Sequence, residues 1–161
     1  MQSRRVPCVG AVVVHEGRLL LVRRGQEPGR GLWSVPGGRL EPGEPVAEGC
    51  AREVLEETGV RVVAGAVVGT VERPAPDGST YVIDDLDCAV APGAETGPDG
   101  LPALAAGDDA DDAVWATYDD LDALPLVPTP PPRCSSPPAT TPHASATRSP
   151  SPRSSAQHPS R

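Results

Sequence analysis

The chain has 161 residues, enough for one ordinary domain, and 38% of them are hydrophobic. Aromatic residues make up 2% and Phe is absent, so a core has to be built mainly from Val, Leu and Ala. All 22 acidic residues and ten of the 14 arginines precede Val127, which gives this part a formal charge of −12 and the remainder +4. An acidic body argues against non-specific binding to nucleic acid or an anionic membrane, and it suits a site that collects divalent cations.

Two runs rich in Val and Leu, Val6–His15 and Arg18–Arg24, open the chain and are separated by Glu16-Gly17. This pattern predicts two β-strands joined by a hairpin. Arginines ahead of an apolar run are typical of a signal peptide, but no small-residue cleavage site follows, so a first strand is the better interpretation. Because no long apolar stretch occurs elsewhere, we expect a soluble, cytoplasmic protein.

The four cysteines are widely scattered, without a CxxC pair or zinc-ligand spacing. Such residues are typically small buried apolar side chains in a reducing compartment. We therefore expect reduced, buried thiols at all four positions, which are Cys8, Cys50, Cys88 and Cys134.

A loop rich in Gly and Pro, Gly25–Gly37, precedes a predicted helix. Glu44-Pro45 opens this helix, because Pro is tolerated at a first helical position, and Gly59 ends it. Apolar residues recur along it at every fourth position and predict one buried face, made by Val46, Cys50 and Val54.

The second half of the domain is predicted to be mostly strands. Two strands, an acidic Gly-rich loop and a last strand are expected, in this order, at residues 61–73, 80–91, 92–112 and 113–118. Asp119 can then cap a short helix that runs through Leu124.

The composition changes abruptly at Pro128. Residues 128–161 are dominated by Pro, Ser, Thr and Arg, and cannot bury enough surface to offset the entropy cost of ordering. We predict a folded domain over residues 1–127 and a disordered tail over residues 128–161. Because the acidic residues end at the same point, we hypothesise that the tail is a frameshifted or lineage-specific replacement of a closing helix. If neither of the other two reading frames after Val127 encodes a helix with periodic apolar residues, the frameshift hypothesis is wrong.

The segment Gly38–Val60 carries the strongest signal. It consists of Gly38, five residues, Glu44, seven residues, and the run Arg52-Glu53-Val54-Leu55-Glu56-Glu57-Thr58-Gly59-Val60. This resembles the Nudix box, G-x5-E-x7-R-E-U-x-E-E-x-G-U with U an aliphatic residue, at every specified position. At ordinary residue frequencies, a chance match in a chain of this length is on the order of one in 10⁷.

The glutamate spacing points to a metal site without reference to the family. On a helix, Glu53 and Glu57 lie one turn apart and Glu56 lies three residues from Glu53, so we expect all three to cluster. Their repulsion costs roughly a few tenths of a kcal/mol per pair, which calls for a compensating cation. Carboxylate oxygens are ligands that Mg²⁺ and Mn²⁺ prefer. For three glutamates alone, a solvated acidic face is the alternative interpretation.

The resemblance covers residues 6–126 and implies an α/β fold, the Nudix-type α/β/α sandwich with a mixed β-sheet. It implies Mg²⁺ as cofactor, with Mn²⁺ as a substitute, held by Gly38, Glu53, Glu56 and Glu57. It also implies that Arg52 orients these carboxylates and that Glu44 supports or ligates a second ion.

The implied reaction is attack of water on phosphorus. It cleaves a phosphoanhydride in a nucleoside diphosphate linked to another moiety, such as a nucleoside triphosphate or ADP-ribose. Glu53 or Glu56 is expected to act as general base. Many family members recruit a further acid from a distant loop, for which Asp109 is our first choice, with a solvated acidic loop as the alternative. The other candidates in this loop are Asp108, Asp111 and Asp112.

Two other readings remain open: a catalytically silent Nudix-fold module that binds or senses nucleotides, and a damaged gene product that folds poorly. The complete set of Arg52, Glu53, Glu56 and Glu57 counts against the silent module, because binding alone does not require a full metal cluster. The expected partner is a small-molecule nucleotide. The sequence identifies neither the substrate-binding residues nor the oligomeric state.

Overall fold

The computed structural model describes residues 3–107 and 109–128, so Asp108, Cys134 and all of the predicted tail except Pro128 lie outside the described residues. The elements, in chain order, are β1 (Arg5–His15), β2 (Arg18–Arg24), β3 (Trp33–Ser34), β4 (Gly37–Arg39), α1 (Val46–Thr58), β5 (Val62–Pro74), β6 (Thr80–Val90), β7 (Ala110–Ala116) and α2 (Tyr118–Ala123). Within the described part of the chain, no helix is long and apolar enough to cross a membrane.

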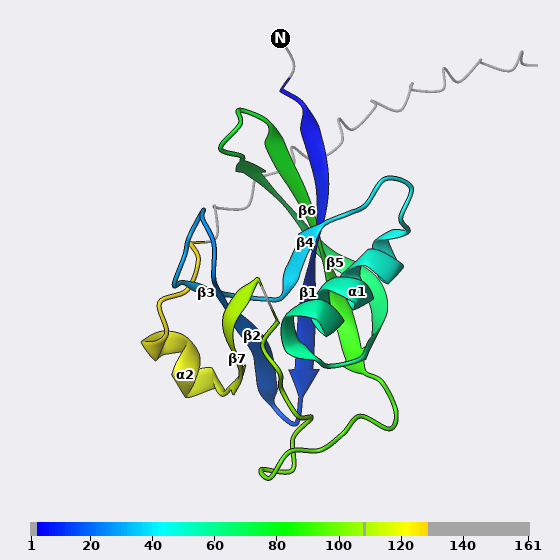
Figure 1. The fold of residues 1–161 in the computed structure, drawn as a ribbon, viewed down its shortest axis with the longest axis vertical. Helices are drawn as coiled ribbons and strands as arrows, with labels where there is room; N and C mark the ends of the chain where they lie inside the picture. Colours follow the sequence, from blue (N-terminus) through cyan, green and yellow to red (C-terminus); the bar gives the residue numbers. More distant parts are fainter. Residues whose placement is uncertain (1–2, 108, 129–161) are drawn as a thin grey trace, which may run out of the picture.

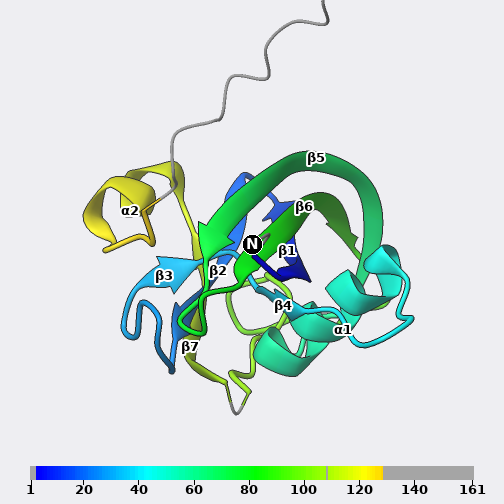
Figure 2. The same cartoon turned by 90° about the horizontal axis from the view of Figure 1, so that it is seen from above.

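The strands form one mixed seven-stranded sheet (Figure 1). Its main order is β3-β2-β1-β6-β5, with β4 also paired to β1 and β7 to β2. Strand β1 runs parallel to β6 and antiparallel to β2 and β4. The helices α1 and α2 lie on opposite sides of the strands (Figures 1 and 2), which confirms the predicted fold class. The second helical layer is small, because α2 has six residues and none of them is buried.

The predicted hairpin between β1 and β2 is confirmed. Its two turn residues, Glu16 and Gly17, have φ angles of 47° and 72°, which is the left-handed conformation that tight hairpins require. The pair His15 and Arg18 closes the turn. This hairpin brings β2 beside β1 and leaves the rest of β1 free to pair with β4 and β6.

Helix α1 buries the predicted apolar face. Cys50 and Val54 are fully buried in the main core, and Val46 packs against that core. Gly59 ends the helix as expected, with a φ of 74° and its N–H donating to Leu55. The predicted start was off by one residue: Pro45 is extended at the N-cap, and the helix begins at Val46.

The last strand and helix differ from the prediction. Strand β7 begins at Ala110, three residues early, because β2 continues to Arg24 and offers it a partner there. Helix α2 begins after Thr117 and not at Asp119, since Thr117 and Asp120 form a reciprocal capping box. Three of the cysteines are buried and free, as predicted: Cys8, Cys50 and Cys88.

Candidate active site

One arginine organises the first half of the motif. The Arg52 Nε and Nη2 atoms donate to the two carboxylate oxygens of Glu44 at 2.7 and 2.9 Å. Its Nη1 atom donates to Glu53 at 2.9 Å and to Glu56 at 3.1 Å. The hydrogen bonds from Arg52 lower the pKa of Glu44 to about 2, so this carboxylate is ionised at neutral pH. A single guanidinium therefore holds three carboxylates in place.

The glycine of strand β4 lies directly against one of these carboxylates. A Cβ atom at Gly38 would lie 2.5 Å from the carboxylate atoms of Glu53, so only glycine fits without moving that side chain. Burial raises the pKa of Glu53, and the hydrogen bond and charge of Arg52 partly oppose this rise. Gly38 and Glu53, predicted to share a metal, are thus adjacent.

Glu57 occupies a different environment. Its Oε2 atom accepts a hydrogen bond from the backbone N–H of Gly37 at 2.9 Å. Burial raises the pKa of Glu57 to about 7, although this hydrogen bond and the charge of Arg24 act in the opposite direction. Bringing a cation to this carboxylate would offset the cost of burying its charge.

The acidic loop reaches the C-terminal end of α1. Gly107 N–H donates to the carbonyl of Glu57 at 3.1 Å, and Gln26 Nε2 donates to Asp109 Oδ1 at 2.7 Å. The negative charge of Asp109 is among the causes that raise the pKa of Glu57. Of the other acids predicted in this loop, Asp111 and Asp112 are exposed residues of β7.

The predicted residues do not form one closed cluster. Across residues 3–107 and 109–128, no three Asp, Glu, His or Cys side chains converge as a ready-made metal cage. Arg52 reduces the glutamate repulsion that calls for an added cation, but its one positive charge offsets only one of the three negative charges of Glu44, Glu53 and Glu56. What remains is an open set of hard oxygen donors around Gly38 and Glu57, which suits a divalent cation that keeps water and phosphate ligands.

Sequence reasoning missed three groups near Glu57. They are the N–H of Gly37, the side chain of Gln26 that holds Asp109, and the charge of Arg24. The Gly37-Gly38 pair signalled a close backbone approach but not its partner. Gln26 and Arg24 carried no signal, because their role depends on the pairing of β2 with β7.

Comparison with known proteins identifies the class. Residues 4–133 match the NUDIX domain family, and the chain belongs to this family. It is 32% identical to the ADP-ribose pyrophosphatase of Methanocaldococcus jannaschii over 116 residues, 72% of this chain and 64% of that protein. It is 32% identical to the CTP pyrophosphohydrolase of Escherichia coli over 71 residues, 44% of this chain and 53% of that protein. The chain thus spans less than two thirds of either relative.

A solved structure gives the same result. The MutT protein from Methanosarcina mazei Go1 superposes with a TM-score of 0.63 at 26% identity, covering 80% of this chain and 88% of that chain. The two relatives differ in the substrates that their names give, so family membership does not select a substrate for this chain.

Proposed function

We propose that the protein is a Nudix hydrolase that uses Mg²⁺, or Mn²⁺ in its place, to hydrolyse a phosphoanhydride in a nucleoside diphosphate derivative. The observation that carries this proposal is the pair of half-buried carboxylates, Glu53 and Glu57, beside the Gly37-Gly38 backbone. Glu53 and Glu57 both have a pKa raised by burial, so both are poised to accept a proton or a cation.

The residues present fit a divalent cation. The donors are all oxygen atoms, and the missing side chain at Gly38 opens the backbone next to Glu53. The proposed ligand set is Gly38 through its carbonyl, Glu53, Glu56, Glu57 and Asp109. When bound, the cation neutralises charge on the phosphate oxygens and lowers the pKa of water.

The protein groups have separate roles in this mechanism. Glu53 accepts the proton of the attacking water, a role favoured over Glu56 because the Glu53 side chain is 14% exposed and that of Glu56 is 58% exposed. Arg52 fixes the orientation of Glu53, and Glu44 fixes Arg52 through two hydrogen bonds. The N–H of Gly37 orients Glu57. The water oxygen then bonds to phosphorus as the bridging oxygen leaves.

The test is a nucleotide panel with Mg²⁺ that includes nucleoside triphosphates, ADP-ribose and dinucleoside polyphosphates. Product release is followed by phosphorus NMR in ¹⁸O-labelled water, for wild type and for Glu57→Gln. We expect turnover of at least one substrate, label in a phosphate product, and loss of turnover in the variant. Nucleotide binding without any turnover would favour the catalytically silent module. Equal turnover in wild type and Glu57→Gln would show that the proposed site does not carry the reaction.

A further inference from the structure

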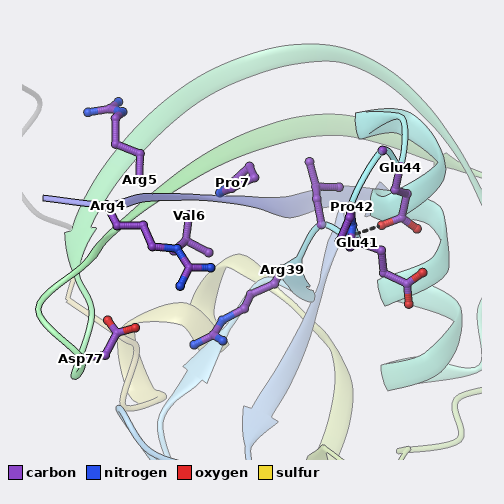
Figure 3. Close-up of a pocket in the computed structure, with 11 residues that line it drawn as sticks. Arg4, Arg5, Val6, Pro7, Arg39, Glu41, Pro42, Glu44 and Asp77 are labelled. Carbon is purple, nitrogen blue, oxygen red and sulfur yellow. Dashed lines mark hydrogen bonds between the residues drawn. The ribbon is translucent and has the colours of Figure 1, made fainter.

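A surface pocket of about 420 Å³ lies beside the candidate site (Figure 3). It is lined by the start of β1, by Arg39 of β4, by the loop from β4 to Glu44, and by Asp77 of the β5–β6 turn. A side chain at Gly38 would point at Glu53, and successive side chains of a strand point to opposite faces. Arg39 therefore points away from α1, and the pocket lies across β4 from Glu53, while Glu44 lines it.

Two guanidinium groups face this pocket, and neither forms an ion pair with a carboxylate of the described residues. Arg4 and Arg39 point into the same space, whereas Arg5 points away (Figure 3) and pairs with Glu72 at 2.6 Å. Among the residues that the structure describes, neither Arg4 nor Arg39 has an ion pair.

Arg39 is held in place by Tyr81. Its guanidinium lies over the Tyr81 ring, 5.1 Å from the centroid, and its Nη2 donates to the Tyr81 hydroxyl. Stacking and this hydrogen bond fix the guanidinium and leave other N–H donors for a ligand. An arginine fixed in this way loses less entropy when it binds an anion.

The acidic residues of the pocket form their hydrogen bonds with groups other than the two guanidiniums. Both oxygens of Glu44 accept hydrogen bonds from Arg52, and Glu41 is exposed at the rim. Asp77 Oδ1 accepts from the N–H and the hydroxyl of Ser79; these hydrogen bonds, and to a smaller extent the charge of Arg39, lower the pKa of Asp77. Asp77 thus stays charged and opposes an anion that the arginines attract.

We propose that Arg4 and Arg39 form a phosphate-binding subsite for the part of the substrate beyond the cleaved anhydride, an inference that rests on the proposed function. The pocket adjoins the candidate site through Glu44, which lines it, and through the Arg39 carbonyl, which accepts from Arg52 at 3.2 Å. Guanidinium pairs match phosphate oxygens in charge and geometry. The subsite favours substrates that carry a further phosphate beyond the cleaved bond, such as nucleoside triphosphates and dinucleoside polyphosphates, over those that continue as a neutral sugar.

The first experiment measures binding of inorganic tripolyphosphate by calorimetry in EDTA, which separates the pocket from any metal. We expect Arg4→Ala and Arg39→Ala to weaken binding about tenfold each, the loss of one charge-assisted contact. The matched control is Arg18→Ala, at the start of β2 opposite the last residue of β1, which should leave binding unchanged. Asp77→Asn should strengthen binding severalfold, a gain that misfolding cannot produce.

The outcomes separate this proposal from the proposed function. Absence of binding to wild type, equal binding in both arginine variants, or an equal loss in Arg18→Ala overturns the subsite. If binding depends on the two arginines but no nucleotide is hydrolysed, the subsite stands and the proposed function falls. For an active wild type, Arg39→Ala should raise KM for a triphosphate about tenfold and leave KM for ADP-ribose little changed. An equal rise for both substrates would contradict the preference for a terminal phosphate.

Discussion

The two ends of helix α1 place glutamates of one motif in opposite electrostatic states. Just before the helix, hydrogen bonds from Arg52 lower the pKa of Glu44 to about 2. At its last turn, burial raises the pKa of Glu57 to about 7. The residue type is the same, and the difference lies in the surroundings: Arg52 donates hydrogen bonds to Glu44, whereas Glu57 is largely removed from water. The protein itself supplies a counter-charge that keeps Glu44 ionised, whereas a bound proton or an external cation offsets the cost of burying Glu57.

The largest effect on the rate is expected at Glu53, which lies between Glu44 and Glu57 in the motif. Glu53→Gln keeps the shape of the side chain but removes its charge, and we expect the hydrolysis rate to fall by about 10³-fold, within the range for loss of a general base. Steady-state kinetics on the active substrate measure this, with Glu48→Gln, an exposed site in the first turn of α1, as control. A Glu53→Gln rate within tenfold of wild type would mean that Glu53 is not the base.

A second change displaces the carboxylate without altering its charge. In Gly38→Ala the new methyl would lie 2.5 Å from the Glu53 carboxylate, which has to move. A misplacement of about 1 Å costs roughly a hundredfold in rate, and we expect a loss of that size with little change in melting temperature. Gly69→Ala is the control, because no atom lies within 4 Å of its added methyl. Equal rates in both variants would show that the position of Glu53 is unimportant.

The raised pKa of Glu57 predicts that the stability of the metal-free protein depends on pH. Because the pKa of Glu57 is about 7 when folded and near 4.5 when unfolded, the folded state binds more protons between these values. Stability therefore falls as pH rises from about 4.5 to about 7. Glu57→Gln removes this cost, and we expect it to stabilise the protein at pH 8 by on the order of 1–3 kcal/mol and not at pH 4.

Urea unfolding of wild type and Glu57→Gln in EDTA, at both pH values, measures this difference. Adding Mg²⁺ at pH 8 should stabilise wild type and close much of the gap. The same stability difference at pH 4 and pH 8 would show that the effect is packing and not charge.

The smallest effect is expected when Arg52 is replaced. Arg52→Met keeps an apolar stem but releases three carboxylates, so we expect divalent-cation affinity to fall about tenfold. Titration with Mn²⁺ by electron paramagnetic resonance measures the affinity. The pKa of Glu44, followed by NMR, should rise from about 2 toward its ordinary value. An unchanged pKa for Glu44 would contradict the assigned counter-ion.

Local features were predictable because they depend on neighbouring residues. The Glu16-Gly17 turn and the Gly59 helix end both require left-handed backbone, which the sequence signals directly. The parallel pairing of β1 with β6 was not predictable, since it joins residues 75 positions apart, such as Arg5 and Thr80. The start of β7 was missed for the same reason, because its partner strand determines it.

The candidate site was likewise predictable in part, where it depends on residues close together in the sequence. The motif named Arg52 and its glutamates, and the structure brings Arg52 to Glu44, Glu53 and Glu56. Helical spacing alone suggested that Glu57 belongs to the same cluster. The structure places Glu57 on the N–H of Gly37 instead, because the β4 backbone passes the last turn of the helix. The surroundings of Glu57 depend on hydrogen bonds and burial between elements, which residue spacing along one helix does not reveal.

The loop before β7 also closes the end of helix α1. Ala105 and Gly107 donate their N–H groups to the carbonyls of Thr58 and Glu57, and a side chain at Gly107 would collide with the Glu56 carbonyl. A segment whose composition suggests a dispensable spacer is therefore hydrogen-bonded to the end of helix α1. For engineering, a peptide inserted beside Gly100 should be tolerated. A peptide inserted after Ala105 would instead separate Asp109 from the end of helix α1 that carries Glu57. Activity of the two insertion variants compares these sites directly.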